Sequence, residues 1–100
     1  MIMGWDSCTL WLRDGASWRR VVVAGCRVER QDGADAATVG PQGACSLRVF
    51  LVSDPGLRPG DYAADGVRAE AEPPEGSRRV SRVNRWSARG GLHHVEVTCE

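Results

Sequence analysis

The sequence contains no lysine, although thirteen of its 100 residues are basic, so every basic residue is an arginine. Thirteen acidic residues balance them, and the formal net charge of zero does not predict binding to nucleic acid or membranes through bulk electrostatics. The exclusive use of arginine has two interpretations. It reflects codon bias in a GC-rich genome, or it marks a protein rich in interfaces, where arginine is preferred over lysine in ion pairs.

Long hydrophobic runs are also missing. The longest apolar stretch, residues 21–25, is far too short to span a bilayer. Residues 1–5 carry no basic region, and no apolar segment of the kind found in secretory signals follows them. We therefore expect a protein that is made and used in a cytoplasm and has no membrane contact.

Metal-binding spacings are absent as well. None of the four cysteines, which are Cys8, Cys26, Cys45 and Cys99, forms a Cys-x-x-Cys pair. Each lies in or beside a strand-like segment with apolar neighbours, which predicts buried structural thiols. The two histidines, His93 and His94, are adjacent and would point to opposite faces of a strand, so they do not predict a shared metal ion.

Catalytic signatures are missing too. The sequence has no Gly-x-Ser-x-Gly, no His-Glu-x-x-His and no glycine loop of the phosphate-binding type. Cys99 and His93 can share one strand face, but no orienting acid accompanies them. We therefore expect no enzymatic activity, no catalytic residues, no metal and no cofactor.

What the sequence does contain is a series of strand patterns. Residues 92–99 and 8–13 alternate between apolar and polar positions, and residues 45–52 alternate with a half-apolar second face. The turn at Asp14-Gly15 predicts a hairpin with residues 18–24, and Gly25 predicts a bulge before the strand continues.

These patterns predict an all-β fold. We expect one domain, residues 1–100, that forms a small barrel or sandwich of about five to seven antiparallel strands. Two long loops, residues 31–43 and 54–78, interrupt the strands, and the second contains a short strand at residues 62–64. Loops of this length in a compact domain are usually functional or disordered.

Charge is unevenly distributed in the last part of the chain. Residues 61–75 hold five acidic side chains and one arginine, whereas residues 78–89 hold five arginines and no acid. Three interpretations fit: neutralisation across a sheet, head-to-tail self-association of an acidic arm with a basic strand, or a DNA-binding face. The predicted inter-subunit or channel-facing residues are Asp61, Asp65, Glu70, Glu72, Arg78, Arg79, Arg82 and Arg85.

Simple alternation argues against one dense arginine stripe. It places Arg78 and Arg82 on one strand face and Arg79 and Arg85 on the other. Direct DNA binding is therefore the weakest of the three interpretations.

Four of the six aromatic residues are tryptophans. We expect Trp11 and Trp18 to pair across strands or to cap the edge of the core. The alternative is that Trp11 is an interface anchor, a role in which tryptophan is enriched, and Trp86 is a second candidate for this role.

The order of these signals resembles that of small head–tail connector proteins of long-tailed bacteriophages, in particular the head-closure or stopper type. The resemblance is carried by the strand pair at residues 9–29, by the turn Pro59-Gly60-Asp61 with Gly66 after the middle strand, and by the closing hairpin at residues 80–97. The sequence departs from the family pattern at His94, where an aromatic residue is usual, and in its final Thr98-Cys99-Glu100.

The resemblance implies a structural virion protein of the phage neck. Such proteins form rings of about six or twelve copies of one chain that join the portal or adaptor protein to the tail terminator or tail tube protein. The ring helps to close or gate the channel during head completion, and DNA passes through it without sequence-specific binding. The implied location is the virion neck, after assembly in the host bacterial cytoplasm. Adaptor, stopper and tail-terminator positions all remain open.

Two other functional classes remain open beside the resemblance. One is a cytoplasmic β-sandwich that binds a peptide or protein partner, and a soluble monomer with no ring form would favour it. The other is an oligonucleotide-binding barrel. Salt-dependent DNA affinity that is lost on Arg82→Ala and Arg85→Ala would favour that class.

Overall fold

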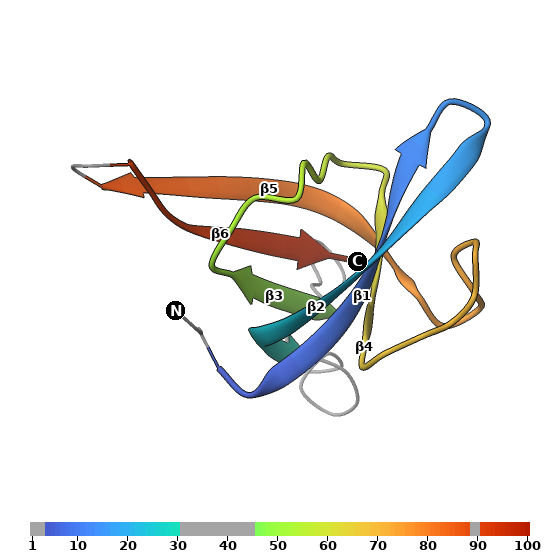
Figure 1. The fold of residues 1–100 in the computed structure, drawn as a ribbon, viewed down its shortest axis with the longest axis horizontal. Coiled ribbons are helices and arrows are strands. Elements are labelled where there is room, and N and C mark those ends of the chain that lie inside the picture. Colours follow the sequence, from blue (N-terminus) through green and yellow to red (C-terminus); the bar gives the residue numbers. More distant parts are fainter. Residues whose placement is uncertain (1–3, 31–45, 89–90) are drawn as a thin grey trace.

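The protein is a closed antiparallel β-barrel, described here from a computed structural model that covers residues 4–30, 46–88 and 91–100 (Figure 1). Its six strands are β1 (Asp6–Asp14), β2 (Ser17–Arg30), β3 (Leu47–Leu51), β4 (Tyr62–Asp65), β5 (Arg78–Ala88) and β6 (Gly91–Cys99). The predicted small all-β barrel is confirmed. The predicted short strand within loop 54–78 corresponds to β4, and loop 31–43 lies outside the described residues.

The barrel consists of two three-stranded meanders, β1-β2-β3 and β4-β5-β6, which join along both edges. Pairing of β3 with β6 closes one seam over five residue pairs, and pairing of β1 with β4 closes the other over four. An isolated meander would leave two rows of unpaired backbone groups exposed, and closure satisfies both rows.

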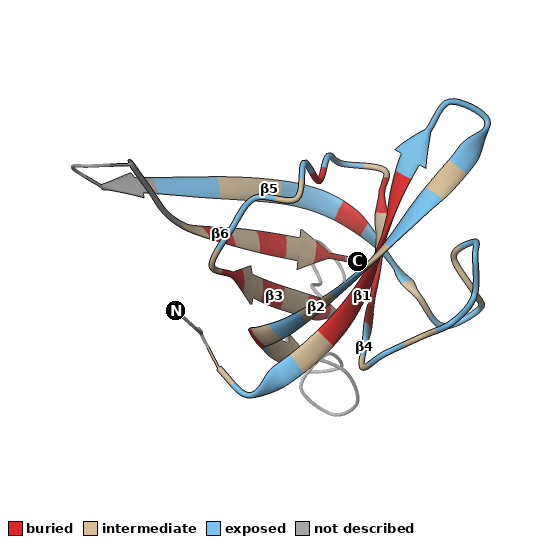
Figure 2. Cartoon of the chain, in the orientation of Figure 1, coloured by how far each residue is buried: buried red, intermediate tan, exposed pale blue. Residues whose placement is uncertain are grey.

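Alternation along the strands produces the core. Val49 of β3 and Val95 and Val97 of β6 are fully buried, and the residues between them are only partly so (Figure 2). Each such side chain contributes about 1.5–3 kcal/mol through removal of apolar surface from water. The alternation predicted for residues 45–52 and 92–99 is therefore confirmed at the described positions, while the side chain of His93 is not described.

A bulge at Gly25 allows β2 to pair with both of its neighbours, β1 and β3. The register with β1 passes from Ser7↔Ala24 to Asp6↔Cys26, so Gly25 is an extra residue, and its φ of 73° is one that L side chains rarely adopt. Before the bulge β2 pairs with β1, and after it residues 27–30 pair with β3. The predicted bulge is confirmed, and it bends the long strand around the barrel.

One end of the barrel is plugged by the corner segment, residues 52–61, which links β3 to β4. Leu57 at its centre is fully buried within the core cluster. Arg85 of β5 holds the segment by donating to the Leu57 carbonyl at 2.8 Å and to the carboxylate of Asp54. The corner segment therefore closes this end of the barrel with the buried Leu57 side chain and with the ion pair between Asp54 and Arg85.

Asp61 fastens the same segment from within. Its carboxylate accepts the backbone N–H of Arg13 at 3.0 Å through one oxygen and that of Arg58 at 2.9 Å through the other. The residue is only 2% exposed. Both oxygens are thus used to satisfy backbone donors that the corner would otherwise bury without partners.

Substitution of Asp61 tests this role. We expect Asp61→Asn to lower the free energy of unfolding by about 1–3 kcal/mol, because the amide can accept only one of the two N–H groups and turns a donor towards the other. Urea denaturation followed by tryptophan fluorescence measures the change. Asp65→Asn, at an exposed carboxylate, is the matched control and should lie within about 0.5 kcal/mol of the native chain. Equal effects of the two substitutions would contradict the assignment.

Candidate functional site

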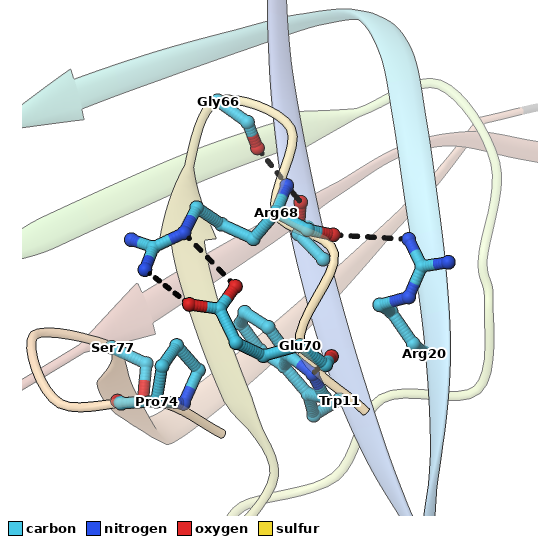
Figure 3. A network of polar contacts seen from close by, with 8 residues as sticks. Trp11, Arg20, Gly66, Arg68, Glu70, Pro74 and Ser77 are labelled. Carbon is cyan, nitrogen blue, oxygen red and sulfur yellow. Dashed lines mark hydrogen bonds and ion pairs between the residues drawn. The ribbon is translucent and has the colours of Figure 1, made fainter. Parts of the chain in front are cut away.

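The segment that follows β4, residues 66–77, lies across the outer face of β1 and is called the strap. The Thr9 hydroxyl donates to the Gly66 carbonyl and accepts the N–H of Arg68, both at 2.8 Å. The indole N–H of Trp11 donates to the Glu70 carbonyl at 2.8 Å, and Arg20 of β2 donates to the Arg68 carbonyl at 3.0 Å (Figure 3). The strap is therefore bound to the barrel by side chains that reach its backbone.

The strap explains why Trp11 is fully buried although it lies on the outer face of β1. In the register Trp11 is opposite Arg20 and Trp18 is opposite Arg13, so the two tryptophans are not direct cross-strand partners. Direct cross-strand pairing, one of the two predicted arrangements of these tryptophans, is therefore wrong. Because Trp11 is covered by its own chain, it offers no surface as an interface anchor in this conformation.

Trp18 instead packs against the ring of Tyr62, with ring centroids 5.7 Å apart in an edge-to-face arrangement. Both residues line an open groove of about 410 Å³. The distal part of the strap lines the same groove and contributes Glu72, Pro74 and Glu75 among others. The groove therefore combines two aromatic residues with two acidic residues, a chemistry suited to a cationic or aromatic side chain.

A second exposed aromatic site lies on the hairpin of β5 and β6. Trp86 is 51% exposed and stacks on His94, its cross-strand neighbour, with centroids 6.0 Å apart and ring planes 20° apart. Arg82 lies on the same outer face of β5, where it pairs with Thr98. Trp86, His94 and Arg82 are together called the hairpin face, which combines a stacked aromatic pair with a basic side chain.

A bulge in β5 accounts for the position of Arg82. The register passes from Val80↔Cys99 to Arg82↔Thr98, so Ser81 is an extra residue on this strand. From Arg82 onward, every side chain of β5 faces opposite to the direction that simple alternation would give.

The bulge overturns the predicted grouping of the arginines. Arg79 lies on the outer face because it is adjacent in the strand to buried Val80. Arg82 lies on the same face because it pairs with outward-facing Thr98. Arg78 and Arg85 take inward positions at opposite ends of β5, where they pair with buried residues of β4 and β6. The prediction that Arg78 groups with Arg82, and Arg79 with Arg85, is therefore wrong.

Ion pairs among the described residues involve four of the eight predicted charged residues, which are Asp65, Glu70, Arg79 and Arg85. The pairs are Arg68–Glu70 at 2.6 Å, Arg79–Glu100 at 3.0 Å, Arg30–Asp65 at 4.0 Å, and Arg85–Asp54. None of these pairs joins the acidic stretch 61–75 to the arginines of residues 78–88, so their mutual neutralisation is not seen in the described structure. Within the described residues Glu72, Glu75, Arg78 and Arg82 have no ion-pair partner.

Two of these pairs shift the acidity of their carboxyl groups. The hydrogen bond from Arg85 lowers the pKa of Asp54, and the hydrogen bond from Arg68 lowers the pKa of Glu70. Both carboxylates therefore stay ionised at neutral pH and are directed to arginines of their own chain.

Asp61, another predicted site residue, has a structural role, because its carboxylate is buried and accepts hydrogen bonds from backbone donors. It therefore cannot contribute to an exposed acidic surface in this conformation.

Three of the four cysteines are described, and all three are buried, as predicted; Cys45 lies outside the described residues. Burial raises the pKa of Cys8, and the neighbouring thiol of Cys26 raises it further. Burial also raises the pKa of Cys26 itself. The thiols of Cys8 and Cys26 therefore remain protonated at neutral pH and are poor nucleophiles.

In residues 4–30, 46–88 and 91–100 no group of three or more His, Cys, Asp or Glu side chains is arranged to hold a metal ion. The same residues include no helix with the length and hydropathy of a membrane span. The surfaces that these residues do provide are suited to recognition: an acidic aromatic groove beside the strap and a basic aromatic hairpin face.

Comparison of the chain with protein-family models, with curated proteins and with solved structures finds no match.

Removal of the Thr9 hydroxyl tests the attachment of the strap. We expect Thr9→Val to raise the hydrogen-exchange rate of the Arg68 amide by about tenfold, because that amide loses its acceptor. Exchange measured by NMR or by mass spectrometry gives the rate. Thr98→Val, on the outer face of β6, is the control and should leave the Arg68 amide unchanged. Unaltered exchange in Thr9→Val would show that the strap is held by other contacts.

The buried thiols make a second measurable prediction. We expect iodoacetamide at pH 8 to leave Cys8, Cys26 and Cys99 unmodified in the folded protein and to modify all three in denaturant, because burial protects all three and a raised pKa also protects Cys8 and Cys26. Peptide mapping by mass spectrometry reads out each site separately. Alkylation of any of the three at the same rate in folded and unfolded protein would contradict this account.

Proposed function

We propose that this chain is a structural subunit of a bacteriophage neck. Copies of it form a ring that joins the portal or adaptor protein to the tail and helps to close or gate the DNA channel. The proposal rests on the resemblance of residues 9–29, 57–66 and 80–97 to head–tail connector proteins and on one structural observation. That observation is the half-exposed Trp86, stacked on His94 on a hairpin that projects from the barrel.

The positions of the two surfaces support a head-to-tail ring. The outer part of the β5–β6 hairpin, at the end of β5, and the strap lie towards opposite ends of the longest molecular axis, which measures 40 Å (Figure 1). A contact between two different surfaces of the same chain is heterologous, and it closes into a ring when the rotation between copies permits. One copy can thus present its hairpin face to the groove of the next.

Chemical complementarity supports the same contact. The hairpin face carries Arg82, and the groove carries Glu72 and Glu75, none of which has an ion-pair partner within the described part of the chain. Each surface also has aromatic rings, which favour burial at the centre of an interface. Both surfaces therefore have charge and apolar area that remain unused in the single chain.

Among the predicted acidic residues, Glu72 is the strongest candidate for an exposed role. Asp61 is buried, Glu70 is bound to Arg68, and Asp65 lies 4.0 Å from Arg30. An acidic residue that faced passing DNA would repel its phosphates and let the genome slide. Glu72 either serves this purpose or meets Arg82 of a neighbouring copy.

Electron microscopy of native phage particles, or of the chain co-expressed with its portal protein, tests the proposal directly. We expect density for this chain in a ring between head and tail, with the β5–β6 hairpin of each copy against its neighbour. Absence of the chain from the neck, together with a monomer in solution, would remove the connector function and favour a partner-binding module.

Substitutions identify the ring contact. We expect Trp86→Ala to abolish ring formation on the portal, whereas Trp5→Ala, at a tryptophan that is 91% exposed, should leave it intact. Arg82→Glu and Glu72→Arg should each weaken assembly, and the double reversal should restore it if the two residues meet. Normal rings from Trp86→Ala and from both single reversals would show that copies associate through other surfaces.

A further inference from the structure

The two ends of the barrel differ. The corner segment plugs one end with Leu57, whereas the other end has a mouth where β2 and β4 finish and β3 and β5 begin. A cavity of about 150 Å³ opens at this mouth. Its lining residues are Arg30, Ser46, Leu47, Ala64, Asp65, Arg68, Gly76 and Arg78.

The charge of the lining is strongly unbalanced. Three arginines line the cavity, and Asp65 is the single acidic residue among the described lining residues. Arg68 is bound to Glu70 on the strap, and Arg30 lies 4.0 Å from Asp65. Arg78 has no carboxylate within ion-pair distance among the described residues, so its positive charge is uncompensated there.

An unsatisfied hydroxyl lies at the same place. The Ser46 Oγ is buried and has no hydrogen-bond partner among the described residues, although the backbone N–H of the same residue donates to the Cys99 carbonyl at 3.0 Å. A buried hydroxyl without a partner costs about 1–3 kcal/mol, and such groups are rare in folded proteins. A ligand oxygen in the cavity would accept this hydrogen bond.

We infer that the barrel mouth is a binding site for a phosphate-type oxyanion. A tetrahedral anion offers enough acceptor oxygens for the guanidinium groups of Arg30, Arg68 and Arg78 and for the Ser46 hydroxyl together. Planar guanidinium forks bind phosphate in a bidentate manner, which a lysine could not do. Cavities of about 150 Å³ accept ligands of about the size of benzene, so the volume fits a single phosphate group.

This inference is independent of the proposed ring. The lining residues all belong to one copy, and none of them is part of the hairpin face. The ligand is identified by its chemistry as a phosphate, which is either the free ion or a phosphate group of a nucleic acid.

Calorimetric titration of the full chain with inorganic phosphate, in a buffer of constant ionic strength set by chloride, tests the site. We expect saturable binding at one site per chain, with about a tenfold weaker Kd in Arg78→Gln. Arg82→Gln, which removes an exposed arginine of the same strand outside the cavity, should bind phosphate like the native chain. No saturable binding, or an equal loss in both variants, would overturn the assignment.

Ser46→Ala separates binding from folding. We expect this variant to bind phosphate more weakly while its free energy of unfolding without phosphate is unchanged or higher, because the substitution removes an unsatisfied hydroxyl. Unchanged phosphate affinity in Ser46→Ala would exclude the hydroxyl from the site. Urea denaturation of each variant, with and without phosphate, provides the stability values.

Competition experiments distinguish the source of the phosphate. Two single-stranded oligonucleotides of the same sequence, one with a 5′-phosphate and one with a 5′-hydroxyl, are added against bound inorganic phosphate. Displacement by the phosphorylated strand alone assigns the site to a terminal phosphate, and equal displacement by both assigns it to the nucleic-acid backbone. Displacement by neither assigns it to the free ion.

Discussion

The pairing of β4 with β1 is the contact on which the rest of this structure depends. Strand β4 has only four residues, yet it closes the seam between the two meanders. Asp61 anchors its beginning to the backbone of β1, and Thr9 anchors the strap that leaves its end. The aromatic groove lies at the start of β4 and the arginine-lined mouth at its end. The aromatic groove and the barrel mouth thus both depend on the same short strand.

Features set by local pattern could be predicted from the sequence. Alternation identified the buried faces of β3 and β6, and the glycine at position 25 identified the bend in β2. These two predictions succeed because the alternation of side chains along a strand and the backbone φ are properties of a few adjacent residues. The fold class followed from the number and spacing of such segments.

Features set by distant partners could not be predicted in this way. Trp11 occupies an outward position, and its burial depends on a strap some sixty residues later in the chain. Asp61 sits in a stretch rich in acids, and only its two backbone donors distinguish it from its exposed neighbours. The bulge at Ser81 has no glycine to mark it, so alternation assigned the arginines of β5 to the wrong faces. The candidate site was therefore located only in part.

The filled interior of the barrel has a consequence for any assembly that conducts DNA. Valines and leucines occupy the space around the barrel axis, and Leu57 seals one end, so no single copy can act as a tube. A passage must therefore run between copies, with its wall made from the outer faces of the strands and the connecting segments. The width of such a passage would be set by how many subunits encircle it, and each barrel would form one solid segment of its wall.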